Sequence, residues 1–323
     1  MRIVFFGSAA FAVPALEKLN ATEGIEVAAV FTQPDRPAGR GRASAFTAVK
    51  SAALALGLPV LQPEELDADA LAKLRHFAPD AVAIIAYGKL IPPEFLPAAP
   101  RGWLNLHPSL LPRYRGAAPV PHCILNGDAE TGVTIFRLNE KFDQGDILAV
   151  KKIPVPPDAT GATLLDDLAP LGAALLAQVL LAEKWEFLPQ SGEKSSYARK
   201  FAKADGEIDW RLPALAIDRR VRAYQPWPLA YTYYGDRRLT LTKIAVTDRP
   251  ATAALATALP ATALPATALP ATVVIDKNEF YVATADKLVK IITVIPEGKA
   301  AMTGAEFLRG ARLKSGERLT VRD

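Results

Sequence analysis

The 323-residue sequence predicts a two-domain α/β protein, with a Rossmann-like domain built on a mostly parallel sheet and a small C-terminal β-barrel of the OB-like type. The length suits two domains of roughly 100–200 residues each. Strand-like and helix-like segments alternate through the first half, as in parallel α/β domains. Five short strand-like segments dominate the second half. That strand number fits an OB-like barrel, although other small barrels share it.

Hydrophobic periodicity and β-branched runs place the elements of the first half. The predicted strands are Arg2–Phe6, Val27–Thr32, Pro59–Leu61, Ala81–Tyr87, Trp103–His107, Val133–Leu138 and Ile147–Val155. The predicted helices are Phe11–Asn20, Phe46–Gly57, Ala68–Phe77, Val120–Asn126 and Thr163–Trp185. Strands separated by helices in this way predict a sheet that is covered on both faces.

The apolar periodicity stops in residues 187–205, where Pro, Ser, Gly and Lys predict a linker between a first domain at 1–186 and a barrel domain at 206–323. The barrel domain has the predicted helix Pro213–Tyr224 and the predicted strands Leu229–Tyr234, Arg238–Val246, Ala271–Asp276, Glu279–Ala283 and Leu288–Val294. Three Ala-Thr-Ala-Leu-Pro repeats fill residues 256–270. Because such regular prolines exclude a continuous helix or a central strand, residues 251–272 predict a low-complexity surface loop.

Composition narrows the class of protein. Hydrophobic residues make up 50% and charged residues 22% of the chain, as in globular enzymes. The single cysteine, Cys123, excludes an internal disulfide, and the three scattered histidines lack the spacing of metal ligands. The longest apolar stretch, Leu168–Ala182, is interrupted and shorter than the roughly 18 residues of a membrane span. Because the sequence starts without a signal-peptide pattern, we expect a cytoplasmic protein. Nothing in the sequence demands an oligomer, so we expect a monomer.

Charge is distributed unevenly along the chain. Residues 1–189 contain 17 basic and 20 acidic residues, whereas residues 190–323 contain 21 basic and 14 acidic ones. A basic half beside a mildly acidic half indicates that the C-terminal part meets a polyanion.

Asn105 and His107 lie two residues apart on a predicted strand, so both side chains emerge on the same face. Pro108 ends the strand there and places the imidazole at its carboxyl end, where open α/β sheets bind ligands. An amide donates hydrogen bonds, and an imidazole donates, accepts or changes charge near neutral pH. Taken alone, the pair is more typical of a structural histidine beside a capping asparagine.

Asp143 follows the predicted strand 133–138 on a glycine-containing turn and, taken alone, is typical of a turn former. In an α/β sheet this turn can face the strand end that carries His107, where a carboxylate would favour the charged imidazole. With Asn105, these groups could stabilise an oxyanion and move a proton. None is a ready covalent nucleophile, so direct attack by a bound amine fits best.

Several motifs together resemble the folate-dependent formyltransferases. They are His107–Pro119, Thr131–Ile135, Asp143–Asp146 and Thr32–Arg42, with smaller matches at Phe11–Leu16, Ala86–Gly88, Ile208–Trp210, Arg222–Pro228 and Gly298–Lys299. The loop Thr32–Arg42 makes the chain most similar to the family members that act on methionyl initiator tRNA. The resemblance covers nearly the whole chain apart from the Ala-Thr-Ala-Leu-Pro repeats.

The resemblance implies transfer of a formyl group from 10-formyltetrahydrofolate, the cosubstrate, to the α-amine of methionyl initiator tRNA for translation initiation. It implies that Asn105, His107 and Asp143 are the catalytic residues. The Asn105 amide and a protonated His107 would hold the oxyanion, and Asp143 would keep the imidazole charged. The family needs no metal.

The resemblance also implies two binding surfaces. The folate-binding residues would be Ala86, Tyr87, Gly88, Ser109, Leu110, Leu111, Pro112, Gly116 and Asp146, with at least one of the two leucines also in the core. The tRNA-binding residues would be Arg36, Arg40 and Arg42 on a Pro/Gly-rich loop and, in the second half, Arg219, Arg220, Arg222, Arg237, Arg238 and Lys243. Exposed arginines suit phosphates and unstacked bases.

Three alternatives stay open. An enzyme that formylates a nucleotide-linked amino sugar would share the folate module, but the loop 36–42 and the basic second half disfavour a small sugar substrate. A tRNA-binding module without catalysis would not be expected to keep Asn105, His107 and Asp143 intact. A nicotinamide dehydrogenase is disfavoured because Gly7-Ser-Ala does not continue into a G-x-G-x-x-G fingerprint.

Overall fold

The computed structural model describes residues 1–38, 43–251 and 269–320, and the chain forms two compact units. The first unit consists of Met1–Pro119, Ala129–Val155 and Thr163–Arg199, and the second of Val120–Asp128, Pro156–Ala162 and Lys200–Asp323. Two short segments of the predicted first domain, 120–128 and 156–162, therefore join the second unit. Arg40, Arg42 and most of the predicted loop 251–272 lie outside the described residues.

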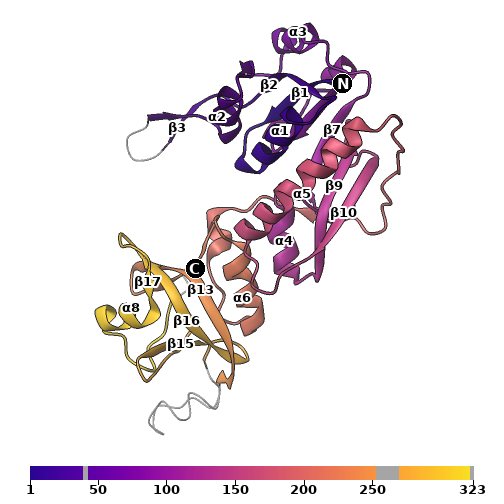
Figure 1. The fold of residues 1–323 in the computed structure, drawn as a ribbon. Coiled ribbons are helices and arrows are strands. Elements are labelled where there is room, and N and C mark those ends of the chain that lie inside the picture. The colour runs from indigo at the N-terminus through magenta and orange to yellow at the C-terminus, as the bar shows by residue number, and fades with distance from the viewer. Residues whose placement is uncertain (39–42, 252–268, 321–323) are drawn as a thin grey trace. The chain divides into compact units, whose positions relative to one another are not determined.

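A seven-stranded sheet forms the centre of the first unit (Figure 1). Its strands are β1 (Arg2–Gly7), β2 (Glu26–Phe31), β5 (Val60–Leu61), β6 (Ala81–Ile85), β7 (Trp103–His107), β9 (Glu130–Arg137) and β10 (Ile147–Pro154). In the order β10-β9-β7-β6-β1-β2-β5, the pairs from β7 to β5 are parallel, whereas β9 runs antiparallel to both β7 and β10. The predicted mostly parallel α/β sheet is thus confirmed.

Helices follow the strands of the first unit. They are α1 (Val13–Asn20), α2 (Ala48–Ala55), α3 (Ala68–His76) and α5 (Gly161–Leu181), with a short 3-10 helix η1 (Ala10–Ala12) before α1 and another, η2 (Pro93–Ala98), before β7. Thr47 and Asp67 cap α2 and α3 with side-chain oxygens that accept from backbone N–H groups in the first turn. Basic residues end α3, where they complement the helix dipole.

An aromatic cluster holds the sheet under the predicted site. The ring of Phe6 at the end of β1 stacks on Phe31 with a centroid distance of 4.5 Å. The same ring contacts Tyr87 at 5.0 Å and Trp103 at 4.8 Å. All four side chains are fully buried or nearly so. Because Trp103 begins β7, this packing fixes the strand that carries Asn105 and His107.

Helix α5 corrects one expectation from the sequence. Within the described residues, it is long and apolar enough to cross a membrane by length and composition alone, although Pro170 interrupts its sequence. Half of its most apolar window is buried in the protein. A Cβ added at Gly172 would lie 2.5 Å from the Leu106 side chain, so α5 packs tightly on β7. Its apolar face therefore serves the core of the first unit.

The predicted linker is partly a structural element of the first unit. Leu188 forms a bridge with Ile147, and β11 (Tyr197–Ala198) pairs in parallel with β8 (Arg115–Gly116). These contacts hold residues 188–198 against the loop that follows His107. A second feature absent from the prediction is the hairpin of β3 (Arg36–Ala38) and β4 (Ala43–Ala45). Strands of two or three residues carry no periodicity that a sequence pattern can reveal.

The second unit contains a separate antiparallel sheet with the order β12-β13-β16-β15-β14, and β17 pairs with β16. Its strands are β12 (Ala230–Tyr234), β13 (Arg237–Pro250), β14 (Val273–Asp276), β15 (Glu279–Ala283), β16 (Lys287–Pro296) and β17 (Met302–Thr303). The helices are α6 (Ala214–Ala223) and α8 (Gly304–Ala311), with a 3-10 helix η3 (Lys203–Gly206) before α6; a further helix, α4 (Pro119–Asn126), has most of its length in this unit.

The C-terminal segment 316–320 joins the two edges of this sheet. Thr320 exchanges backbone hydrogen bonds with Tyr233 on β12, and Val273 of β14 donates to the Glu317 carbonyl. Leu319 donates to the Ala271 carbonyl directly before β14, and its side chain is only 3% exposed. Both edge strands are therefore paired, which closes the sheet as a barrel requires.

Leu319→Ala should destabilise the second unit, because it removes a buried side chain at the point where the barrel closes. We expect the free energy of unfolding to fall by about 2–5 kcal/mol, measured by calorimetry and urea unfolding. Glu317→Ala changes an exposed side chain in the same segment and should leave stability nearly unchanged. Equal stabilities for both variants would contradict the assignment of segment 316–320 as the barrel closure.

Candidate active site

Strand β7 presents Asn105 and His107 on one face at its carboxyl end. Asn105 lies opposite Ile84 on β6 and Phe136 on β9, and His107 lies opposite Thr134. His107 is 5% exposed, whereas Asn105 is half-buried. Among the described residues, the Asn105 side-chain amide has no hydrogen-bond partner. It is therefore available to donate to a ligand at the rim of the sheet.

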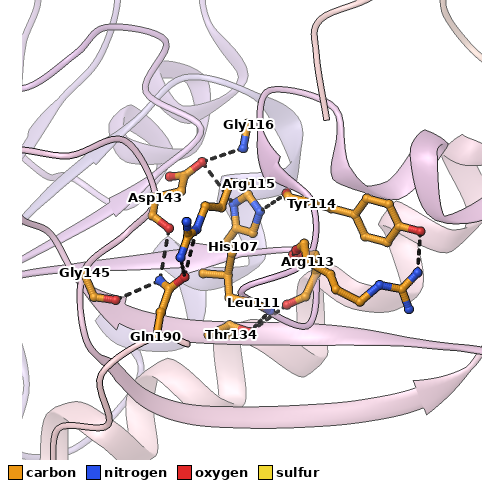
Figure 2. Close-up of polar contacts among 11 residues, drawn as sticks. His107, Leu111, Arg113, Tyr114, Arg115, Gly116, Thr134, Asp143, Gly145 and Gln190 are labelled. Atoms are coloured by element: carbon orange, nitrogen blue, oxygen red, sulfur yellow. Dashed lines mark hydrogen bonds and ion pairs between the residues drawn. The ribbon is translucent and has the colours of Figure 1, made fainter. Parts of the chain in front are cut away.

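The imidazole of His107 is held in a single orientation (Figure 2). Nε2 lies 2.8 Å from the backbone carbonyl oxygen of Tyr114. A carbonyl can only accept, so Nε2 carries a hydrogen and donates it. Nδ1 faces the Asp143 carboxylate, with 4.0 Å between Nδ1 and Oδ2. In the neutral ring, Nδ1 is thus the nitrogen that can accept a proton.

Asp143 reaches this position through a tight turn after β9. Its φ of 52° is in the left-handed region, which is uncommon for a residue other than glycine. The carboxylate is 9% exposed and accepts a hydrogen bond of 2.8 Å from the backbone N–H of Gly116. A Cβ added at Gly145 would lie 1.6 Å from the Arg137 carbonyl oxygen, so only glycine fits there. The turn therefore directs a fixed carboxylate toward His107.

Burial lowers the pKa of the His107 imidazole below its ordinary value, and the charge of Asp143 and the hydrogen bond to the Tyr114 carbonyl oppose this shift without cancelling it. The resting ring is therefore neutral near pH 7. The resemblance implied a protonated His107 during the reaction, and the direction of this pKa shift favours the neutral ring before it. A neutral ring beside a carboxylate is suited to accept a proton first, and the carboxylate then stabilises the cation that forms.

Side-chain hydrogen bonds brace the loop after His107. The Ser109 hydroxyl donates to the Arg113 carbonyl at 2.7 Å. The Thr134 hydroxyl donates to the Ser109 carbonyl at 2.7 Å and accepts from the Leu111 N–H at 3.2 Å. These contacts tie the loop to β9, the strand next to β7.

Several of the predicted folate-binding residues also have structural roles. Leu111 belongs to a buried cluster with Phe136 and Ile147, so its side chain serves the core, whereas Leu110 and Pro112 are half-buried. Gly116 is buried, and its N–H is bonded to Asp143. Ser109 braces its own loop.

The segment Ala86–Gly88 combines a buried ring with two exposed residues. The ring of Tyr87 is in the core, where burial raises the pKa of its hydroxyl to about 12. The Tyr87 carbonyl accepts a hydrogen bond from the Ser8 hydroxyl at 3.0 Å. Ala86 and Gly88 are exposed with positive φ values, so they are the members of this segment that a ligand can approach.

A pocket of about 670 Å³ opens in the first unit beside the Asp143 turn. It is lined by Leu96, Arg115, Arg137, Leu138, Asn139, Glu140, Lys141, Gln144, Asp146, Gln190 and Gly192. Only Asp146 belongs to the residues predicted from the sequence, and its carboxylate lies 3.6 Å from the Arg137 guanidinium. Of the other lining residues, Arg115 and Gln144 lie within the motifs His107–Pro119 and Asp143–Asp146 of the sequence analysis. Nothing in the predicted linker indicated Gln190.

The predicted RNA-binding residues have different surroundings. Arg36 is exposed and forms an ion pair of 3.1 Å with Glu64. Arg222 pairs with Asp218 at 2.8 Å and donates to the Ala159 carbonyl, so its guanidinium is engaged within the second unit.

The other basic residues of the second unit are closer to the surface. Arg238 lies over the Tyr231 ring at 3.9 Å, and Arg220 donates to the Tyr224 hydroxyl. Arg219 is half-buried, and Arg237 and Lys243 are exposed. Within the described ranges, no group of three or more His, Cys, Asp or Glu residues is arranged to hold a metal ion.

Comparisons with known proteins find relatives over the full length of this chain. A methionyl-tRNA formyltransferase of Roseiflexus sp. (strain RS-1) is 44% identical over 325 residues, covering 99% of this chain and 95% of the relative. That of Chloroflexus aggregans is 42% identical over 316 residues, covering 96% and 97%.

Among solved structures, the sugar 3N-formyl transferase WlaRD has a TM-score of 0.64 at 18% identity and covers 93% of this chain and 99% of its own. A methionyl-tRNA formyltransferase from Clostridium thermocellum has a TM-score of 0.58 at 15% identity and covers 77% and 94%. Residues 1–180 match the formyl transferase family and residues 200–312 match the formyl transferase C-terminal domain. With both regions matched, this chain belongs to the formyl transferase family.

Proposed function

We propose that this enzyme transfers the formyl group of 10-formyltetrahydrofolate to the α-amine of methionyl initiator tRNA in the cytoplasm. The observation that carries the proposal is the His107–Asp143 pair beside the unpartnered amide of Asn105 at the carboxyl edge of the sheet. These groups supply a proton acceptor, a charge that stabilises its protonated form and a donor for an oxyanion. Full-length relatives with the name methionyl-tRNA formyltransferase support the choice of acceptor.

The pocket beside the Asp143 turn fits the formyl donor. A folate combines a flat polar ring system with an anionic glutamate tail. Arg115, Arg137 and Lys141 supply cations in the lining, and Leu96 and Leu138 supply apolar surface. Asp146, half-exposed at the same pocket, can accept hydrogen bonds from the ring N–H groups of a pterin. The chemistry of the lining thus matches both ends of the donor.

The residues act in a fixed sequence. Asn105 donates its side-chain N–H to the oxygen that gains negative charge when the amine attacks the formyl carbon. His107 accepts the amine proton at Nδ1, because its Nε2–H is already donated to Tyr114. Asp143 stabilises the resulting imidazolium across 4.0 Å. His107 then returns the proton to the leaving nitrogen, and the C–N bond to the donor breaks.

Basic residues on both units would bind the RNA. Arg36 begins the β3–β4 hairpin, and Arg40 and Arg42 lie outside the described residues. In the second unit, Arg219, Arg220, Arg237, Arg238 and Lys243 remain the candidate phosphate contacts. The excess of basic over acidic residues in the second half of the sequence supports this assignment, because RNA is a polyanion.

Substitutions in the catalytic trio test the proposal directly. We expect wild-type enzyme to formylate methionyl initiator tRNA but not free methionine. Asn105→Ala should lower kcat about 10²–10³-fold, because it removes an oxyanion donor, and Asp143→Asn should abolish most activity. Asp158→Asn, at an exposed carboxylate, is the matched control. Robust formylation of free methionine by wild type would overturn the acceptor assignment.

The protonation of His107 gives a second test. The pKa of His107 should lie below its ordinary value in the wild type, and Asp143→Asn should lower it further, because the lost charge is the one that favours the imidazolium. NMR titration of isotope-labelled histidine measures both values, and the chain has only three histidines to assign. A His107 pKa that rises in Asp143→Asn would contradict the proposed pairing.

Salt dependence separates an RNA substrate from a small sugar substrate. Binding that releases counterions from RNA weakens with a log–log slope of roughly −0.7 to −0.9 per phosphate contact. We expect a steep fall of tRNA affinity with salt, measured by filter binding, and a slope reduced by about one contact in Arg237→Ala or Lys243→Ala. An affinity that does not change with salt would favour the amino-sugar alternative.

A further inference from the structure

The side chain of Gln190 lies between the Asp143 turn and the loop after His107 (Figure 2). Nε2 donates to the carbonyl oxygens of Asp143 at 3.0 Å and Gly145 at 2.8 Å. Oε1 accepts from Nε and Nη2 of Arg115 at 3.0 and 2.8 Å. Four hydrogen bonds use both donors and both lone pairs of the amide. A residue from the predicted linker is therefore fully engaged with the site.

The Asp143 turn needs support of this kind. The left-handed conformation of Asp143 is unfavourable for a residue with a side chain, so the turn relaxes unless other contacts hold it. Gln190 donates hydrogen bonds to the backbone carbonyls of Asp143 and Gly145 in this turn. Asp143 carries the carboxylate that faces His107. Relaxation of the turn would move that carboxylate away from Nδ1.

Gln190 also controls the position of a cation. Arg115 directly precedes Gly116, whose N–H binds the Asp143 carboxylate. The Nε and Nη2 groups of Arg115 both donate to the Gln190 side-chain oxygen. Released from that oxygen, the guanidinium would be free to pair with the Asp143 carboxylate and to compete with His107 for it. The Gln190 amide thus keeps the Arg115 guanidinium in the pocket wall. The Asp143 carboxylate is then left directed at the His107 imidazole.

The same segment holds the other partner of His107. We call residues 190–198 the strap. The Ser196 hydroxyl accepts from the N–H of Tyr114 at 2.9 Å, and the Ser196 carbonyl accepts from the N–H of Arg115 at 2.9 Å. Tyr114 in turn provides the carbonyl that binds Nε2 of His107. The strap therefore fixes the groups on both sides of the imidazole.

We propose that Gln190 is a positioning residue, which acts through the backbone of Asp143 and through Arg115 to keep the Asp143 carboxylate aligned with His107. The role in catalysis rests on the proposed function above, whereas the alignment itself does not. Gln190 need not touch the reacting atoms. Its amide is suited to this role because it combines donors for two carbonyls with an acceptor for a guanidinium, and neither an acid nor an apolar side chain provides both.

Three substitutions separate these contributions. Gln190→Met keeps a side chain of similar length without hydrogen bonds. Gln190→Glu keeps an acceptor for Arg115 but loses both donors and sets a charge against the carbonyls of Asp143 and Gly145. Gln190→Asn keeps the amide on a shorter chain. Ser191→Ala, at the exposed neighbouring position where the hydroxyl only accepts from the Glu193 N–H, is the control.

The measurements are steady-state formyl transfer and NMR titration of His107. We expect Gln190→Met and Gln190→Glu to lower kcat by about 10-fold or more, since small displacements of a catalytic group carry effects of this size, with a smaller change in the KM of the formyl donor. The pKa of His107 should fall in Gln190→Met as the carboxylate moves away. Gln190→Asn should retain more activity than Gln190→Met, and Ser191→Ala should match the wild type.

The outcomes distinguish the alternatives. Wild-type kcat and an unchanged His107 titration in Gln190→Met would overturn the positioning role. A change in the KM of the formyl donor alone would also overturn it and leave Gln190 as part of the pocket wall. Absence of formyl transfer in the wild type would refute the proposed function but not this inference, because the shift of the His107 pKa is measured without substrate.

Discussion

A buried carboxylate beside a buried imidazole is the constraint on which the site depends. Burial disfavours charge on both groups, so each needs partners that the fold must supply. The Gly116 N–H binds the carboxylate, and the Tyr114 carbonyl binds the imidazole. Both partners come from the loop after β7. The path of that loop therefore decides whether His107 and Asp143 face one another at a usable distance.

That loop is held by segments that are distant in sequence. Thr134 on β9 binds its beginning, and the strap binds its end through Ser196 and the β8–β11 pairing. Below it, the Phe6–Trp103 contact fixes the start of β7. Support from several elements allows the left-handed backbone conformation of Asp143 to persist. The turn cannot move to a more favourable conformation without breaking contacts to those elements. Catalysis by preorganised groups requires such rigid support, because the side chains must already be in place when charge develops in the transition state.

The sequence predicted the regular elements well. Strands β7 and β15 have the predicted bounds, since apolar alternation and a flanking proline or turn mark both ends. The β3–β4 hairpin and the β8–β11 pair were missed because their strands have two or three residues. Residues 187–205 were predicted as a linker because their polar composition, with Pro, Ser, Gly and Lys, does not reveal backbone pairing. The helix at 163–185 was predicted, but its apolar stretch was judged too short for a membrane span because Leu168–Ala182 is interrupted, whereas α5 is long and apolar enough by length and composition.

The sequence by itself determined the fold class, the strand that carries Asn105 and His107, and the motifs that name Asp143, because these follow from local periodicity and residue chemistry. The tertiary structure decided which atoms meet. Only folding brings Gln190 to the Asp143 turn across 47 residues and Ser196 to Tyr114 across 82. It also decided the direction in which the His107 pKa shifts, because the cost of charging an imidazole depends on what surrounds it and not on its neighbours in the chain.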